Sequence, residues 1–91
     1  MARLLQTAAS VTEEPRMVLS QRIGRTYLLI QNKGPDLAYV GFEKSDNTRA
    51  DDAFEVRPSG GNLEIRGPCA EGAVFAACAA AKSARLVFLE G

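Results

Sequence analysis

The feature that most constrains the fold of this chain is its division into short apolar runs by clusters of Gly, Pro, Asn, Asp and Ser. Runs of this length, bounded by turn residues at fairly regular spacing, are typical of strands in a sandwich or barrel. The chain has 91 residues, which is enough for one hydrophobic core and no more. We therefore expect a single all-β domain, a small β-sandwich or a jelly-roll-like barrel of antiparallel strands.

The clearest strand covers residues 26–32 (TYLLIQN), which are rich in aromatic and β-favouring side chains. Apolar side chains fall on both of its faces, which predicts a strand that is covered on both sides. Residues 37–42 (LAYVGF) form the next apolar run. The short Gly34-Pro35 link predicts that these two strands form an antiparallel hairpin.

Two further strands are predicted at residues 54–57 and 63–66, where apolar and charged residues alternate. This alternation indicates one buried and one exposed face. The PSGGN segment between them, residues 58–62, reads as a hairpin turn and lacks the pattern of a phosphate-binding loop. Residues 43–52 are polar throughout, so we expect an exposed loop there.

The alanine-rich segment, residues 70–85, allows two interpretations. Alanine is the best helix former, which favours a helix. The alternative is a strand through residues 73–76, a turn near residues 80–83, and a strand at 84–89 that returns beside the first. We favour the strands, because a helix would lack a polar face and because the final apolar run needs a neighbouring strand.

The N-terminal segment gives weaker signals. Residues 17–19 form a short apolar run after a proline, and residues 4–11 could be an edge strand or an arm. We therefore divide the chain into an N-terminal arm or edge strand, residues 1–21, and a β-sandwich domain, residues 22–91. A domain this small often gains stability from association, so we also expect an oligomer.

Several kinds of chemistry are disfavoured by composition. The chain has no histidine, which removes the commonest general base and the usual zinc ligand. Two cysteines, Cys69 and Cys78, are too few for a disulfide scaffold and are expected to be free and buried. The acidic cluster of Asp46, Asp51 and Asp52 does not match a calcium loop and reads as solvated. We expect no catalytic residue, no metal site and no cofactor.

The charges are balanced overall, with 11 basic and 11 acidic residues, but they are unevenly distributed. Residues 1–33 carry five Lys or Arg and two Glu, whereas residues 34–57 carry six acids and three bases. Opposite surpluses suit head-to-tail contact between identical copies, and the alternative is that these segments are ordinary solvated faces. The lack of a net basic charge makes nucleic acid an unfavoured partner. We keep one nucleic-acid function as the alternative for this chain: an OB-like module that stacks single-stranded nucleic acid on Tyr27 and Tyr39.

The sequence shows the pattern of neither a membrane helix nor a signal peptide. The longest uncharged run, residues 72–81, is far shorter than the roughly 20 apolar residues of a membrane helix. The first seven residues lack the apolar region of a signal peptide. We expect no membrane contact and synthesis in the cytoplasm.

One order of strand and turn motifs resembles a known class of protein. The motifs are RTYLLIQN at 25–32, YVGF at 39–42, PSGG at 58–61, GP at 67–68 and LVFLEG at 86–91. Over roughly residues 22–91 the chain resembles small virion proteins of tailed bacteriophages. This resemblance implies a β-sandwich or jelly-roll-like subunit that decorates or cements a capsid, or belongs to a head fibre or head-tail junction. The implied partners are other copies of the chain and the major capsid protein or other virion proteins, in a particle assembled in a bacterial host.

If the resemblance holds, apolar strand faces are buried between subunits and the oppositely charged segments set their orientation. The expected interface residues come from the two clearest strands and from the flanking charged segments. They are Tyr27, Leu29, Tyr39, Phe42, Arg22, Arg25, Asp51 and Asp52.

Overall fold

The computed structural model describes residues 4–49 and 51–91, and in these residues the chain forms eight strands and two short 3-10 helices. The elements are, in chain order, β1 (Leu5–Val11), β2 (Arg16–Leu19), β3 (Tyr27–Asn32), β4 (Ala38–Phe42), η1 (Ser45–Thr48), β5 (Phe54–Val56), β6 (Asn62–Arg66), η2 (Pro68–Glu71), β7 (Val74–Ala77) and β8 (Ala84–Glu90).

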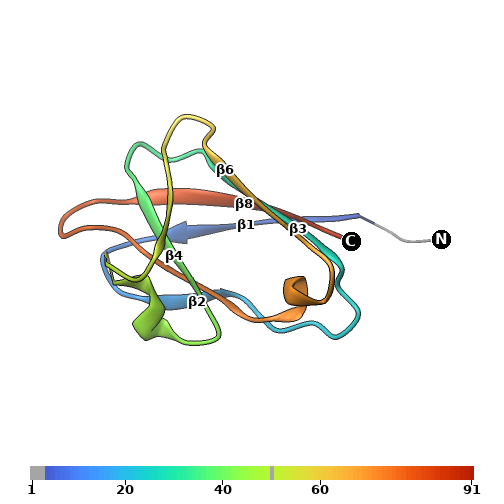
Figure 1. Cartoon of the computed structure of the whole chain (residues 1–91). Helices are drawn as coiled ribbons and strands as arrows, with labels where there is room; N and C mark the ends of the chain where they lie inside the picture. Colours follow the sequence, from blue (N-terminus) through green and yellow to red (C-terminus); the bar gives the residue numbers. More distant parts are fainter. Residues whose placement is uncertain (1–3, 50) are drawn as a thin grey trace.

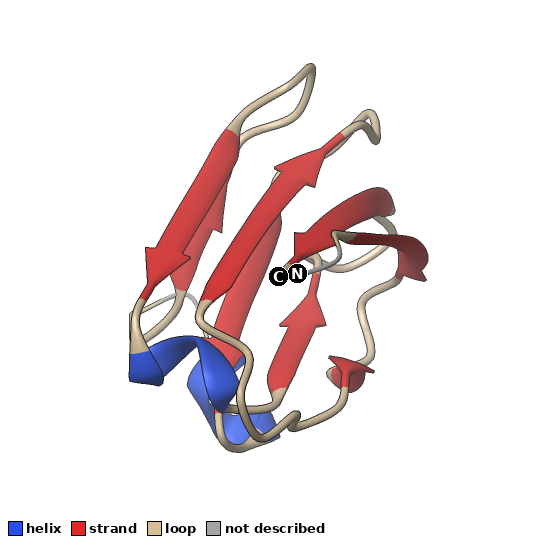
Figure 2. Ribbon diagram, turned by 90° about the vertical axis from the view of Figure 1, so that its right-hand side faces the viewer, coloured by secondary structure: helices blue, strands red, loops and turns tan. Residues whose placement is uncertain are grey.

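The strands form two packed antiparallel sheets of four strands each (Figures 1 and 2). One sheet, called sheet A, has the order β1-β8-β3-β6, and the other, sheet B, has the order β2-β7-β4-β5. The first four strands thus pair with the last four in reverse order, as if one long hairpin had been rolled up. This is the jelly-roll form of a β-sandwich. The predicted all-β sandwich is confirmed, and the two sheets do not close into a barrel.

The predicted hairpin of β3 and β4 is wrong, because the two strands belong to different sheets. Buried Asn32 gives the physical reason. Its side-chain amide donates hydrogen bonds to the carbonyls of Asp36 and Val56, and its side-chain oxygen accepts one from the amide of Gly34. These bonds hold the turn after β3 against β5, so the chain crosses to the other sheet.

Two other predicted pairings fail in the same way. The segment at residues 58–62 joins β5 to β6, which lie in different sheets, so it is not a hairpin turn. The alanine-rich segment forms strands, as predicted, but β7 and β8 also lie in opposite sheets. Ala76, Ala77 and Ala84 are buried, and this burial overrides the helix propensity of alanine.

The N-terminal strands are integral to the sandwich. β1 is an edge strand of sheet A and β2 is an edge strand of sheet B, so the folded domain begins at β1 and not at residue 22. Residues 1–3 of the predicted arm or edge strand lie outside the described part of the chain. β1 starts beside the end of β8, at the same end of the molecule (Figure 1).

The core lies between the sheets, and its large apolar side chains that are fully buried are aliphatic apart from Phe88. Leu28, Ile30, Leu86 and Phe88 come from sheet A, and Val40 is among the residues that meet them from sheet B. An inward-facing large side chain of this kind contributes about 1.5–3 kcal/mol when it is fully buried. This shared layer is what holds the two sheets together.

The prediction that the loop at residues 43–52 is exposed is wrong in part, because η1 folds back onto sheet B. A Cβ atom at Gly41 would lie 2.5 Å from the carbonyl carbon of Asn47, so only glycine allows this close approach. Thr48 is buried, and its hydroxyl donates to the carbonyl of Ser45. The outer face of sheet B is therefore partly covered, which leaves the outer face of sheet A as the more open one.

Candidate interaction surface

The outer face of sheet A carries an apolar strip at its centre. Leu29 of β3 lies opposite Leu89 of β8, and Val87 lies one pair further along, opposite Gln31. All three apolar side chains are only half-buried. They line an open depression of about 330 Å³ whose remaining walls come from Gln6, Gln31 and Lys33. The prediction that β3 is covered on both sides is wrong for the described residues, because no second layer of the chain lies over this face.

A cluster of three polar side chains stands at one end of this face. The hydroxyl of Tyr27 donates to Glu64 over 2.7 Å, and the guanidinium of Arg66 donates to the same carboxylate over 3.1 Å. The Arg66 guanidinium also lies 5.6 Å from the centre of the Tyr27 ring. The hydrogen bond to Glu64 raises the pKa of Tyr27, and the same bond lowers the pKa of Glu64. Tyr27 is thus engaged on its ring and on its hydroxyl.

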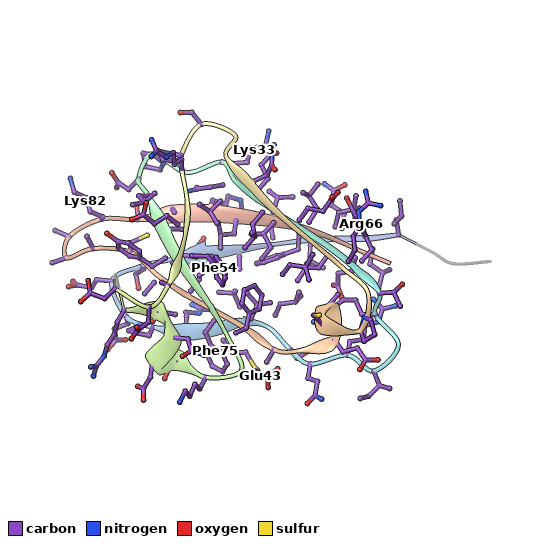
Figure 3. All side chains as sticks on the ribbon, viewed as in Figure 1. Lys33, Glu43, Phe54, Arg66, Phe75 and Lys82 are labelled. Atoms are coloured by element: carbon purple, nitrogen blue, oxygen red, sulfur yellow. The ribbon has the colours of Figure 1, made fainter. Side chains whose placement is uncertain are left out.

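This arrangement does not suit the nucleic-acid alternative. Tyr39 lies on the outer face of sheet B, on the opposite side of the sandwich from Tyr27, so the two rings cannot form one stacking platform. Figure 3 shows the same division, with Lys33 and Arg66 on the upper side and Glu43 and Phe75 on the lower side. The eight described strands in two sheets also differ from a five-stranded OB barrel.

Arg25 also departs from prediction, because it is buried inside the domain and is not available as an interface residue. Its side chain has 0% exposure and its guanidinium lies 2.9 Å from Glu90, whose side chain is 6% exposed. The remaining donors reach the carbonyls of Ala70, Gly72 and Ser20. An uncompensated charge at this depth would be costly, so Arg25 acts as an internal tie between the loop before β3, the η2 segment and the end of β8.

The other predicted interface residues are scattered. Arg22 is partly exposed and lies 3.2 Å from Glu90. Phe42 faces the core and packs edge-on against Phe54. Asp51 and Asp52 are exposed in the turn after η1.

Only Tyr27 and Leu29 of the eight predicted residues lie together on one outer face. Val87 and Leu89 were missed, although residues 84–89 have apolar side chains on both faces, as β3 does.

The reactive side chains do not converge. Cys78 is buried, and desolvation followed by the nearby charge of Asp36 raises the pKa of its thiol. Cys69 is exposed. Within residues 4–49 and 51–91, no three acidic or cysteine side chains are grouped closely enough to hold a metal ion.

Comparisons with known proteins add no assignment. No protein-family model, curated protein or solved structure compared with the chain gives a match. Across the part of the chain that is described, no helix has the length and apolarity to span a membrane. The candidate site is therefore defined by geometry alone, as the open apolar face of sheet A.

Proposed function

We propose that this chain is a non-enzymatic structural protein of a bacteriophage virion, a capsid decoration or cement protein that attaches to the major capsid protein through the outer face of sheet A. The observation that carries the proposal is the half-buried strip of Leu29, Val87 and Leu89 on an uncovered face. The order of strand and turn motifs that resembles small tailed-phage virion proteins supports the choice of particle.

The size of this strip indicates how attachment would work. Burying a fully exposed Leu or Val contributes about 1.5–3 kcal/mol, so covering three half-buried ones contributes about 3 kcal/mol in total. Loss of translational and rotational freedom costs at least about 4 kcal/mol on association. One copy would therefore bind weakly, and stable attachment needs several linked copies on a repeating shell.

The rim of the depression supplies orientation. Lys33 stands at one end of the face, and the Tyr27–Glu64–Arg66 cluster stands at the other. Charged groups around an apolar centre select partners and fix their register more than they add affinity. The partner surface would present an apolar ridge with an acidic group placed for Lys33.

The test is co-sedimentation with shells of the tailed phage that encodes the chain. We expect the wild-type protein to pellet with shells and to raise their melting temperature. Leu29→Lys places a charge in the apolar strip and should abolish both effects. Met17→Lys is the matched control, because Met17 is an exposed residue of sheet B and its change should leave binding intact. Failure of the wild-type protein to bind shells would overturn the proposal.

A further inference from the structure

The four edge strands of the sandwich are protected to different degrees. Natural sheets discourage edge-to-edge pairing with short strands, charged side chains, prolines or bulges. β2 has four residues, begins at Arg16 and shows an irregular register, and β5 has three residues including Glu55. β6 carries Glu64 and Arg66. Each of these edges therefore has at least one protective feature.

β1 has none of these features. It is seven residues long, with the sequence LQTAASV, and contains neither a charge nor a proline. Five of its side chains are exposed, and in the described residues β1 pairs only with β8, which leaves its other edge without a partner strand. Small side chains at its centre leave the backbone accessible. Such an edge is suited to accept another strand.

We propose that β1 pairs antiparallel with β1 of a second copy around a two-fold axis at Ala8, which makes sheet A continuous across a dimer. This register pairs all seven residues of the strand and keeps the outer face of each sheet on the same side. Leu5, which is 43% exposed, would lie opposite Val11 of the second copy, and Gln6 would lie opposite Ser10 of the second copy. The inner face of the seam would therefore join Leu5 to Val11 and Thr7 to Ala9, and the outer face would carry Gln6, Ala8 and Ser10 of both copies.

Such a dimer deepens the proposed function and rests on it. A two-fold axis perpendicular to the sheet directs both apolar depressions to the same side of the dimer. Because Gln6 of β1 lines the depression, the two sites would lie close to the dimer seam. The dimer would then attach to a shell through two linked weak sites, which increases the overall affinity without any new contact.

The test is a charge exchange at the two-fold axis, measured by sedimentation equilibrium. The wild-type protein should have twice the chain mass of 9.8 kDa. Ala8→Lys and Ala8→Glu each place like charges opposite one another and should weaken dimerisation by about 100-fold or more. An equal mixture of the two variants should restore the dimer. Asn62→Lys, an exposed position on the other edge strand of the same sheet, is the matched control and should remain dimeric.

Three results would overturn the inference: a monomeric wild-type protein, an Ala8→Lys variant that still dimerises normally, or a mixture that stays monomeric. If a variant fails to fold, amide hydrogen exchange on the wild-type protein decides instead. Exchange in β1 should slow as protein concentration rises, and exchange that is independent of concentration would refute the pairing. Shell binding distinguishes the two proposals. If the protein dimerises but does not bind shells, only the proposed function is contradicted. If it binds shells but β1 does not pair with a second copy, only the proposed dimer contact is contradicted.

Discussion

Replacing Arg25 tests the ion pair that ties the end of β8 to the loop before β3. Arg25→Met keeps most of the volume but leaves the Glu90 carboxylate, which is 6% exposed, without its closer partner. Removing one member of a buried pair typically costs about 3–5 kcal/mol. The carbonyls of Ala70 and Gly72 also lose their donor, whereas Arg22 still lies 3.2 Å from Glu90, so we expect a loss near the middle of this range. A domain of this size has a free energy of unfolding of about 5–14 kcal/mol, so the variant would be marginally stable.

The assay is thermal and urea unfolding of Arg25→Met, Glu90→Gln and the double variant. A loss of about 4 kcal/mol lowers the melting temperature by roughly 20 °C in a domain of this length. The double variant should lose less free energy of unfolding than the two single variants lose together. The difference, which is the coupling between the two residues, should be about 1–3 kcal/mol. Arg66→Met is the control, because Arg66 pairs with Glu64 at the surface and its loss should leave the transition almost unchanged. A loss below about 1 kcal/mol for Arg25→Met, or strictly additive losses, would refute a buried tie.

Four further predictions concern Gly41, the two cysteines and the Tyr27–Glu64 hydrogen bond. Gly41→Ala inserts a methyl group into the backbone of η1 and should lower the free energy of unfolding by about 1–3 kcal/mol in urea titrations, whereas no change would mean that η1 moves freely. A thiol reagent should modify Cys69 but not Cys78 in the native protein, and unfolding should expose the second thiol. Because burial raises the pKa of Cys78, the unfolded state loses that proton first, so stability is complete below the usual value of 9.0 and falls as pH rises through the folded pKa; Cys78→Ala should flatten this alkaline loss. Glu64→Gln should lower the pKa of Tyr27, so phenolate absorbance should appear at lower pH in an ultraviolet titration, and an unchanged curve would contradict the hydrogen bond.

The positions of the strands could be predicted because burial leaves a local pattern. β3 and β6 fall within one residue of the segments expected from their alternation and β-favouring residues. Partners could not be predicted, because the same alternation fits a strand next to its chain neighbour or in the opposite sheet. The decisive contact for β3 is the buried side chain of Asn32, which bonds to Val56, 24 residues away. Nothing local marks that asparagine as buried.

The candidate surface was also predictable in part, because a strand with apolar residues on both faces can be recognised from the local sequence. Leu29 was identified because β3 is apolar on both faces, and the same criterion applied to β8 would have identified Val87 and Leu89. The sequence predicts Arg25 as an interface residue because it lies in a charged segment that flanks the clearest strand. Its counter-ion is Glu90, 65 residues further along the chain, and only the closing of β8 beside β3 brings the two together.

β1 is both the proposed dimer contact and a strand on the rim of the apolar depression, so its pairing should affect the stability of the domain. Pairing β1 with a second copy satisfies an otherwise open strand edge and anchors the strand that carries Gln6 on the rim of the depression. A partner that binds only the folded state raises the free energy of unfolding by mass action. Dimerisation should therefore add to the stability that the small core of one copy provides. A chain with a weak attachment face and an unprotected edge then benefits twice from association: the dimer is more stable than its subunits, and its two faces can act together on a repeating surface.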